Sequence, residues 1–246
     1  MNGKRVMRIT GTLLLAAGVA MLVWVLVVWR WQDPFTALYT TWKQHQLSQS
    51  YSDRAEAFRL PEPKSKTAAA RVVTAGQIRA QARHYRLATK RGQAVGRLRV
   101  PRLDLNMVVV DGTDHDSLTK GPGLDRRSYM PGEGQLVYIA GHRTTYLAPF
   151  AHIERIKAGD EVSLELPYGT FHYRVFTHKI VGANDMAVLK SHGREVVELQ
   201  ACHPRFFASH RYIVYARLMQ IDPRGAPPIR APARTLAAAP LASTQG

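Results

Sequence analysis

An uncharged stretch of 21 residues near the N-terminus limits what this 246-residue chain can fold into more than any other feature. Residues 9–29 read ITGTLLLAAGVAMLVWVLVVW, and a helix of this length is about 31 Å long, which matches the hydrocarbon core of a bilayer. A cleaved signal peptide is the alternative, but its apolar segment is usually shorter and ends at a cleavage site of small residues. We therefore expect an uncleaved transmembrane anchor at 9–29.

The charges beside this stretch predict its orientation. Lys4, Arg5 and Arg8 precede it, whereas only Arg30 follows it closely. Lys and Arg accumulate on the cytoplasmic side of membrane segments. We expect a single-pass protein of the cell membrane, with residues 1–8 as a cytoplasmic basic flank and the folded region extracytoplasmic.

The positive charge of the chain is concentrated ahead of the folded region. The formal net charge is +16, yet residues 1–94 hold 15 Lys or Arg against 4 Asp or Glu, and residues 95–221 hold 16 against 13. A nucleic-acid-binding domain needs its basic surface on the folded part, so no nucleic-acid partner is expected, and membrane lipid is the expected polyanion. We interpret residues 30–94 as a basic arm and spacer, partly helical, with a solvated helix at 77–91.

Residues 95–221 have the pattern of an all-β domain. Short runs with β-branched and aromatic residues are separated by Gly, Pro and Asp, which is typical of a barrel or sandwich, and alternating βα units are absent. The candidate strands are 96–100, 105–110, 135–140, 161–166, 169–179, 195–201 and 211–220. Residues 222–246 are rich in Pro and Ala and are expected to form a disordered tail.

The single cysteine of the chain is a candidate nucleophile. Cys202 ends an apolar run and precedes His203-Pro204, and since Pro cannot continue a central strand, the thiol is expected at a strand end. A buried structural cysteine is the alternative. An unpaired thiol outside the cell is exposed to oxidation, which favours a functional role.

Two further residues are candidate partners of Cys202. His142 follows a predicted strand and Gly141, so its imidazole is expected at the mouth of the fold, whereas His203 would face the opposite side of its strand. Arg211 opens the last predicted strand and could stabilise an oxyanion. Taken singly, His142 could also be a surface histidine and Arg211 an edge-strand charge.

Three motifs together resemble the sortase family. They are GRLRVP at 96–101, IAGHRTT at 139–145 and ACHP at 201–204, the last with Arg211 beginning the next strand. The sequence AGHRTT followed by APF at 148–150 is most similar to the class E sortases of actinomycetes. One departure is Ala201, where family members commonly have Thr before the cysteine.

The resemblance implies a fold, a reaction and a set of partners. The fold would be a closed eight-stranded β-barrel at 95–221, mainly β with short helices. The enzyme would be a cysteine transpeptidase that cleaves a C-terminal LAXTG- or LPXTG-like sorting signal between Thr and Gly. Cys202 would form the thioester, His142 would be the general acid/base and Arg211 would stabilise the oxyanion or substrate. The partners would be secreted proteins bearing the signal and a peptidoglycan-precursor or pilin amine, with no cofactor and no metal.

Two other functions remain open on the sequence. An extracytoplasmic cysteine peptidase would use the same residues and differ only in passing the acyl group to water. A non-catalytic module tethered near the cell wall would need no reactive thiol. Replacing Cys202 separates the two classes, because an enzyme loses turnover and a binding module keeps its affinity.

Overall fold

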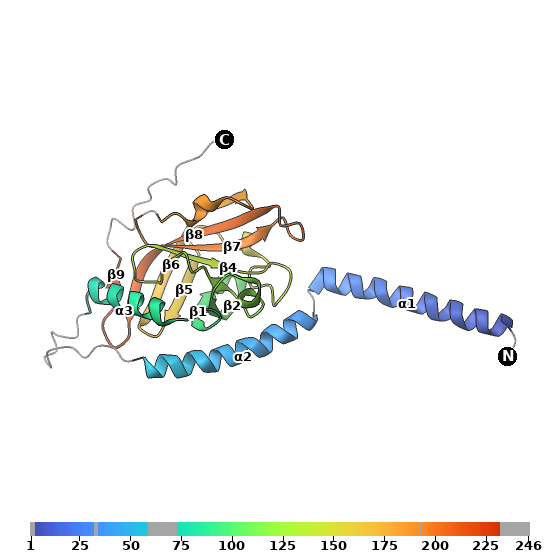
Figure 1. Ribbon diagram of the computed structural model, residues 1–246. Coiled ribbons are helices and arrows are strands. Elements are labelled where there is room, and N and C mark those ends of the chain that lie inside the picture. The colour runs from blue at the N-terminus through green and yellow to red at the C-terminus, as the bar shows by residue number, and fades with distance from the viewer. Residues whose placement is uncertain (1–2, 32–33, 59–72, 192, 232–246) are drawn as a thin grey trace.

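The protein consists of three long N-terminal helices and a β-region (Figure 1). The computed structural model describes residues 3–31, 34–58, 73–191 and 193–231. The long helices are α1 (Gly3–Trp31), α2 (Pro34–Ala57) and α3 (Ala75–Ala88). The strands are β1 (Ala94–Val100), β2 (Leu105–Asp111), β3 (Gly123–Leu124), β4 (Leu136–Ala140), β5 (Glu161–Leu166), β6 (Gly169–Gly182), β7 (Val196–His203), β8 (His210–Pro223) and β9 (Ile229–Arg230). The short helices are α4 (His115–Leu118) and three 3-10 turns at Pro101–Leu103, Ile153–Arg155 and Met186–Leu189.

Eight of the strands close into a barrel, as the sequence predicts. The order is β6-β5-β1-β2-β3-β4-β7-β8, and a pairing of β6 with β8 closes the ring. The β2–β3 and β4–β7 pairs are parallel and the other neighbours are antiparallel. Closure removes the free edges that an open sheet would expose to other chains.

Successive side chains along the barrel strands point alternately into the barrel and out of it. On β7, Val197, Leu199 and Ala201 lie in the main core inside the barrel. The intervening residues face outward, where Val196 belongs to a second buried cluster with residues of β4 and β8. Val188 and Leu189, which are partly buried, pack against this cluster. The period of two along a strand therefore places Cys202 on the outer face, beside this second cluster.

Helix α2 lies along the barrel over β1 and β2 (Figure 1). Its polar side chains bind barrel backbone directly. The amide of Gln44 accepts from the Val108 nitrogen at 2.7 Å and donates to the Val108 oxygen at 2.9 Å, the pattern that a neighbouring strand would supply. Tyr51 donates to the Glu165 carbonyl at 3.0 Å. These bonds fix α2 to the barrel wall.

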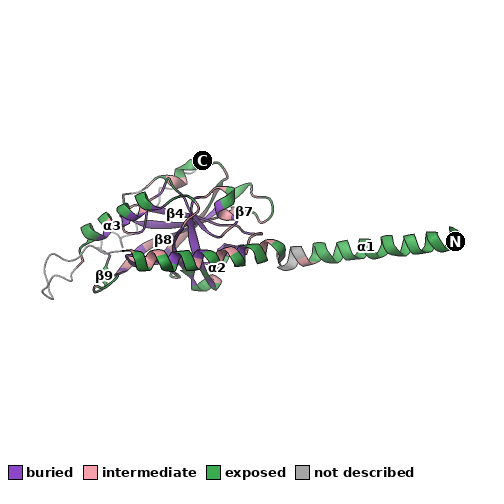
Figure 2. Ribbon diagram, turned by 60° about the horizontal axis from the view of Figure 1, so that its bottom comes forward, coloured by how far each residue is buried: buried purple, intermediate pink, exposed green. Residues whose placement is uncertain are grey.

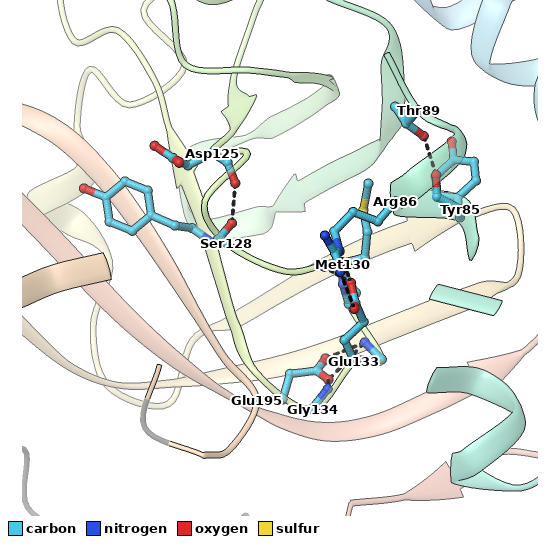
Figure 3. A network of polar contacts seen from close by, with 12 residues as sticks. Tyr85, Arg86, Thr89, Asp125, Ser128, Met130, Glu133, Gly134 and Glu195 are labelled. Atoms are coloured by element: carbon cyan, nitrogen blue, oxygen red, sulfur yellow. Dashed lines mark hydrogen bonds and ion pairs between the residues drawn. The ribbon is translucent and has the colours of Figure 1, made fainter. Parts of the chain in front are cut away.

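Helix α3 corrects the prediction of a solvated spacer at 77–91. Ile78, Ala82 and Tyr85 are buried in the main core, and their spacing of four and three residues places them on one face of the helix. The Tyr85 hydroxyl donates to the Val95 carbonyl at 2.8 Å, and Arg86 forms an ion pair with buried Glu133 (Figure 3). The basic residues occupy the other faces, which is why composition alone suggested solvent on all sides.

The disordered tail predicted for 222–246 is wrong for its first ten residues. Strand β8 continues to Pro223, and β9 pairs with it through Ile229 opposite Ile221. Ala231 is buried in the main core. Apolar side chains in an otherwise Pro-rich segment therefore supply enough burial to order it. Residues 232–246 lie outside the described part of the chain.

Helix α1 is long and apolar enough to cross a membrane over Gly3–Val27. It is the one helix in the described part of the chain that is long and apolar enough to span a bilayer. Its most apolar residues are not buried against the rest of the protein (Figure 2). The predicted anchor at 9–29 falls almost entirely within this segment.

Candidate active site

The three predicted site residues lie at one end of the barrel because of strand direction. β4 and β7 are parallel, so their C-terminal ends lie at the same rim, and β8 starts there because it is antiparallel to β7. Cys202 is the penultimate residue of β7, Arg211 is the second residue of β8, and His142 follows the end of β4 by two residues.

Cys202 and Arg211 are direct cross-strand partners. Opposite residues of an antiparallel pair have Cβ atoms about 4.5–5.5 Å apart on the same face, so thiol and guanidinium share one side of the sheet. The thiol is free and half-buried, in contrast to the alternative of a cysteine fully enclosed in the core. Ala201 is fully buried inside the barrel, so its methyl group faces away from the thiol.

His142 follows β4 at the rim where β7 carries Cys202. The β4–β7 register ends with Ala140 opposite Gln200, and the Gly141 nitrogen donates to the Gln200 carbonyl at 3.0 Å. His142 and Cys202 each lie two residues beyond that last pair, so continued strand directions would place them level with each other. Its Nε2 atom is buried and has no hydrogen-bond partner in the described part of the protein. Burial, with a smaller contribution from the charge of His115, lowers the pKa of His142 below its ordinary value.

Tight packing fixes the loop that carries His142. A Cβ atom at Gly141 would lie 2.7 Å from the Phe150 ring, so a larger residue does not fit there. The Phe150 nitrogen donates to the His142 carbonyl at 3.1 Å, which folds the loop back on itself. Tyr146 stacks at a tilt with its ring centroid 5.1 Å from that of His142, and it has a positive φ of 53°. Such strain in a non-Gly residue persists only where the surroundings hold it.

Arg143 is a contributor that the sequence analysis did not identify. Its side chain is only 7% exposed, and its guanidinium donates to the Cys202 carbonyl at 3.1 Å and to Glu154 at 2.6 Å. It also lies 3.0 Å from the His203 ring nitrogen Nδ1, and burial together with Arg143 lowers the pKa of His203. Arg143 therefore connects the histidine loop to the backbone of the cysteine. The available signal was its position directly after His142, but nothing in the sequence showed that an Arg there would be buried.

Arg211 is tethered at the start of β8. Its Nη1 atom donates to the Ala208 carbonyl at 2.7 Å and to the His210 carbonyl at 2.9 Å. A fixed guanidinium beside a thiol can donate to a carbonyl oxygen that gains negative charge. No group of three or more His, Cys, Asp or Glu side chains able to hold a metal ion occurs among residues 3–31, 34–58, 73–191 and 193–231.

Comparison with known proteins identifies relatives of the barrel. A family model described as the Sortase domain matches residues 98–219. Sortase D of Bacillus subtilis is 35% identical over 130 residues, covering 51% of this chain and 64% of that protein. Sortase SrtE1 of Streptomyces coelicolor is 25% identical over 155 residues, covering 54% of this chain and 42% of that protein. The chain thus spans less than two thirds of the curated relatives that it matches.

The solved structures support the same fold. A Clostridium perfringens Sortase D5 transpeptidase superposes with a TM-score of 0.57 at 19% identity, covering 72% of this chain and 98% of that chain. The expected similarity to class E has only loose support, because the Sortase D relative is more similar in sequence than SrtE1. The matching domain and the sequence relatives lead to one conclusion: residues 98–219 form a sortase domain.

Proposed function

We propose that this protein is a membrane-anchored cysteine transpeptidase that cleaves a C-terminal LAXTG- or LPXTG-like sorting signal between Thr and Gly. The observation that carries the proposal is the β7–β8 register, which pairs Cys202 with Arg211. Further support comes from His142, which follows by two residues the end of β4, a strand parallel to β7. Sortases as a family are cysteine transpeptidases, and a solved Clostridium perfringens sortase C is described with a C-terminal cell-wall sorting motif.

The first half of the reaction follows from these three side chains. The Cys202 thiol passes its proton to His142, and the thiolate attacks the Thr carbonyl carbon. Arg211 stabilises the negative charge that develops on the carbonyl oxygen. The carbon–nitrogen bond to Gly then breaks, and the leaving amine takes a proton from His142. The product is a thioester on Cys202 and a released C-terminal fragment.

In the second half of the reaction, His142 first accepts a proton from the acceptor amine. An amine of a peptidoglycan precursor or of a pilin attacks the thioester carbonyl and gives up a proton to His142. The carbon–sulfur bond breaks, and the Cys202 thiolate takes that proton back from His142. Since burial lowers the pKa of His142, the neutral imidazole predominates near pH 7, in the form that accepts a proton. Transfer rather than hydrolysis requires that the amine reaches the thioester before water does.

The proposal also gives each remaining segment of the chain a position relative to the membrane. Residues 9–29 anchor the protein in the membrane with residues 1–8 in the cytoplasm, because three of the four flanking basic residues precede the segment. Residues 30–94 connect the anchor to a catalytic barrel at 95–221 on the outer side of the membrane. The substrates would be secreted proteins that carry the sorting signal.

Mass spectrometry of the full chain with candidate peptides tests the mechanism. We expect an acyl adduct at Cys202 that ends in Thr, and its transfer to an added amine. Cys202→Ala and His142→Ala should abolish cleavage, and Arg211→Ala should leave a trace. The matched controls are Arg83→Ala and His84→Ala, which change exposed residues on α3.

The outcomes separate the three candidate functions. Normal turnover by Cys202→Ala would refute the thiol mechanism. An adduct that yields only free acid, whatever amine is added, would indicate a hydrolytic peptidase. Peptide or wall-polymer binding without any adduct, unchanged in Cys202→Ala, would indicate a binding module.

A further inference from the structure

The outward side of α2 changes character along the helix. Its first two turns expose large apolar side chains: Phe35 is 71% exposed, Leu38 73% and Trp42 54%, with Tyr39 beside them. From residue 45 onward, the exposed positions carry polar residues and an Ala, among them Gln49 on the same side as Leu38. A cluster of large apolar groups open to solvent marks a contact surface.

The opposite side of α2 prevents these side chains from turning toward the barrel. Thr40 is fully buried, and its hydroxyl donates to the Thr119 carbonyl at 2.9 Å. Gln44 binds the backbone of Val108 and donates to the Lys120 carbonyl at 2.8 Å. With these bonds in place, the exposed apolar side chains of the first two turns face away from the protein.

The apolar part of α2 directly follows the apolar helix α1. Only residues 32 and 33 separate the two helices, and the Trp24 and Phe35 rings lie 5.5 Å apart. The Lys43 ammonium lies 4.3 Å from the centre of the Trp42 ring. Aromatic rings combined with a basic side chain are typical of the boundary between lipid tails and headgroups.

We propose that residues 35–42 insert their exposed apolar side chains into the outer interface of the phospholipid bilayer in which α1 is anchored. The contact is confined to the first two turns, and the polar remainder of α2 stands in water. This inference rests on the membrane anchoring in the proposed function. It adds a lipid-binding surface on the folded part of the protein, which holds the barrel at a fixed height and orientation above the membrane.

The same turn of α2 contacts the candidate active site. The Tyr146 backbone nitrogen donates to the Thr36 hydroxyl at 3.1 Å, and Tyr146 stacks on His142. Thr36 lies one residue from Phe35 in the proposed lipid contact. Docking of this helix on the bilayer would therefore orient the rim that carries His142 relative to the membrane surface.

Fluorescence quenching by labelled lipids tests the proposal with the full chain in phospholipid vesicles. Cys202→Ala gives a chain without cysteine, so one probe position can be introduced at a time. Leu38→Cys, Gln49→Cys and Leu14→Cys each carry an environment-sensitive dye. The first reports the proposed contact, the second the polar part of the same side of α2, and the third the centre of α1. The vesicles contain lipid with a nitroxide either near the headgroup or deep in the tails.

The headgroup nitroxide should quench the dye at position 38 at least about threefold more strongly than the dye at position 49, and the deep nitroxide should quench position 14. Equal quenching at 38 and 49, with position 14 quenched, would overturn the interfacial insertion and leave the anchor intact. An unquenched dye at position 14 would overturn the anchor and the inference together. Because no turnover is measured, neither result depends on the transpeptidase mechanism.

Discussion

Glu198 lies on β7, the strand that carries Cys202, and permits a quantitative prediction. Its side chain is fully buried, and both carboxylate oxygens lack a hydrogen-bond partner in the described part of the protein. Tyr138 and Tyr215 are its cross-strand neighbours. Burial raises the pKa of Glu198 from its ordinary 4.5 to about 8. Between pH 4.5 and about pH 8, the Glu198 carboxyl keeps its proton in the folded chain and releases it in the unfolded chain.

The direction of the pH effect follows from that difference. A group with a raised folded-state pKa gives stability that is complete below pH 4.5 and is lost as the pH rises toward 8. Each pH unit in this range costs about 1.4 kcal/mol, so the loss at pH 7 is about 3 kcal/mol. Glu198→Gln has nearly the same shape and no charge. It should therefore be more stable than the original chain at neutral pH.

Urea unfolding of both chains in detergent, at pH 5 and pH 8, measures the effect. The advantage of Glu198→Gln should widen by about 3–4 kcal/mol between the two pH values. Parallel pH dependence of the two chains would refute the reasoning, because it would mean that the carboxylate has a partner or reaches water.

Glu195, three residues earlier, provides a matched comparison. It is also buried, but its carboxylate accepts from the nitrogens of Gly132 and Gly134 and from the Tyr173 hydroxyl, at 2.9, 3.0 and 2.7 Å. Figure 3 shows Glu195 beside Gly134. Glu195→Gln loses part of this acceptor set, which costs about 1–3 kcal/mol. Burial raises the pKa of Glu195 only to about 6, so removing its charge returns about 2 kcal/mol at pH 8. The stability of the Gln variant relative to the original chain should therefore rise with pH less than half as much at Glu195 as at Glu198.

Three further substitutions test the packing of the site and of α3. Gly141→Ala places a Cβ atom 2.7 Å from a buried aromatic ring and should cost about 1–3 kcal/mol in a thermal melt, with loss of peptide cleavage; unchanged activity would contradict the tight loop. Arg143→Met should lower kcat about 10–100-fold with little change in KM, because the carbonyl of the nucleophile loses its donor; a change in KM alone would assign Arg143 to substrate binding. Ile78→Ala should cost about 2–5 kcal/mol while exposed Arg79→Ala costs almost nothing; equal costs would return α3 to the role of a spacer.

Local patterns in the sequence predicted the longer strands and missed the shortest. The seven predicted runs coincide with β1, β2 and β4 through β8 within a few residues, because each is a run of five or more residues that contains several buried side chains. Strands β3 and β9 contain two residues each. A pair of residues has no periodicity, so only the partner across the hydrogen bonds defines such a strand.

The sequence determined which chemical groups are available, and the tertiary structure decided which of them meet. One cysteine, an uncharged segment long enough to span a bilayer and a Gly-His pair after a strand are visible in the order of residues alone. That Arg143 is buried against the Cys202 carbonyl, that Glu198 has no hydrogen-bond partner among the described residues, and that α2 contacts the His142 loop are not visible there. These contacts join segments 59 to 110 positions apart, and they depend on strand order and barrel closure, which no local pattern encodes.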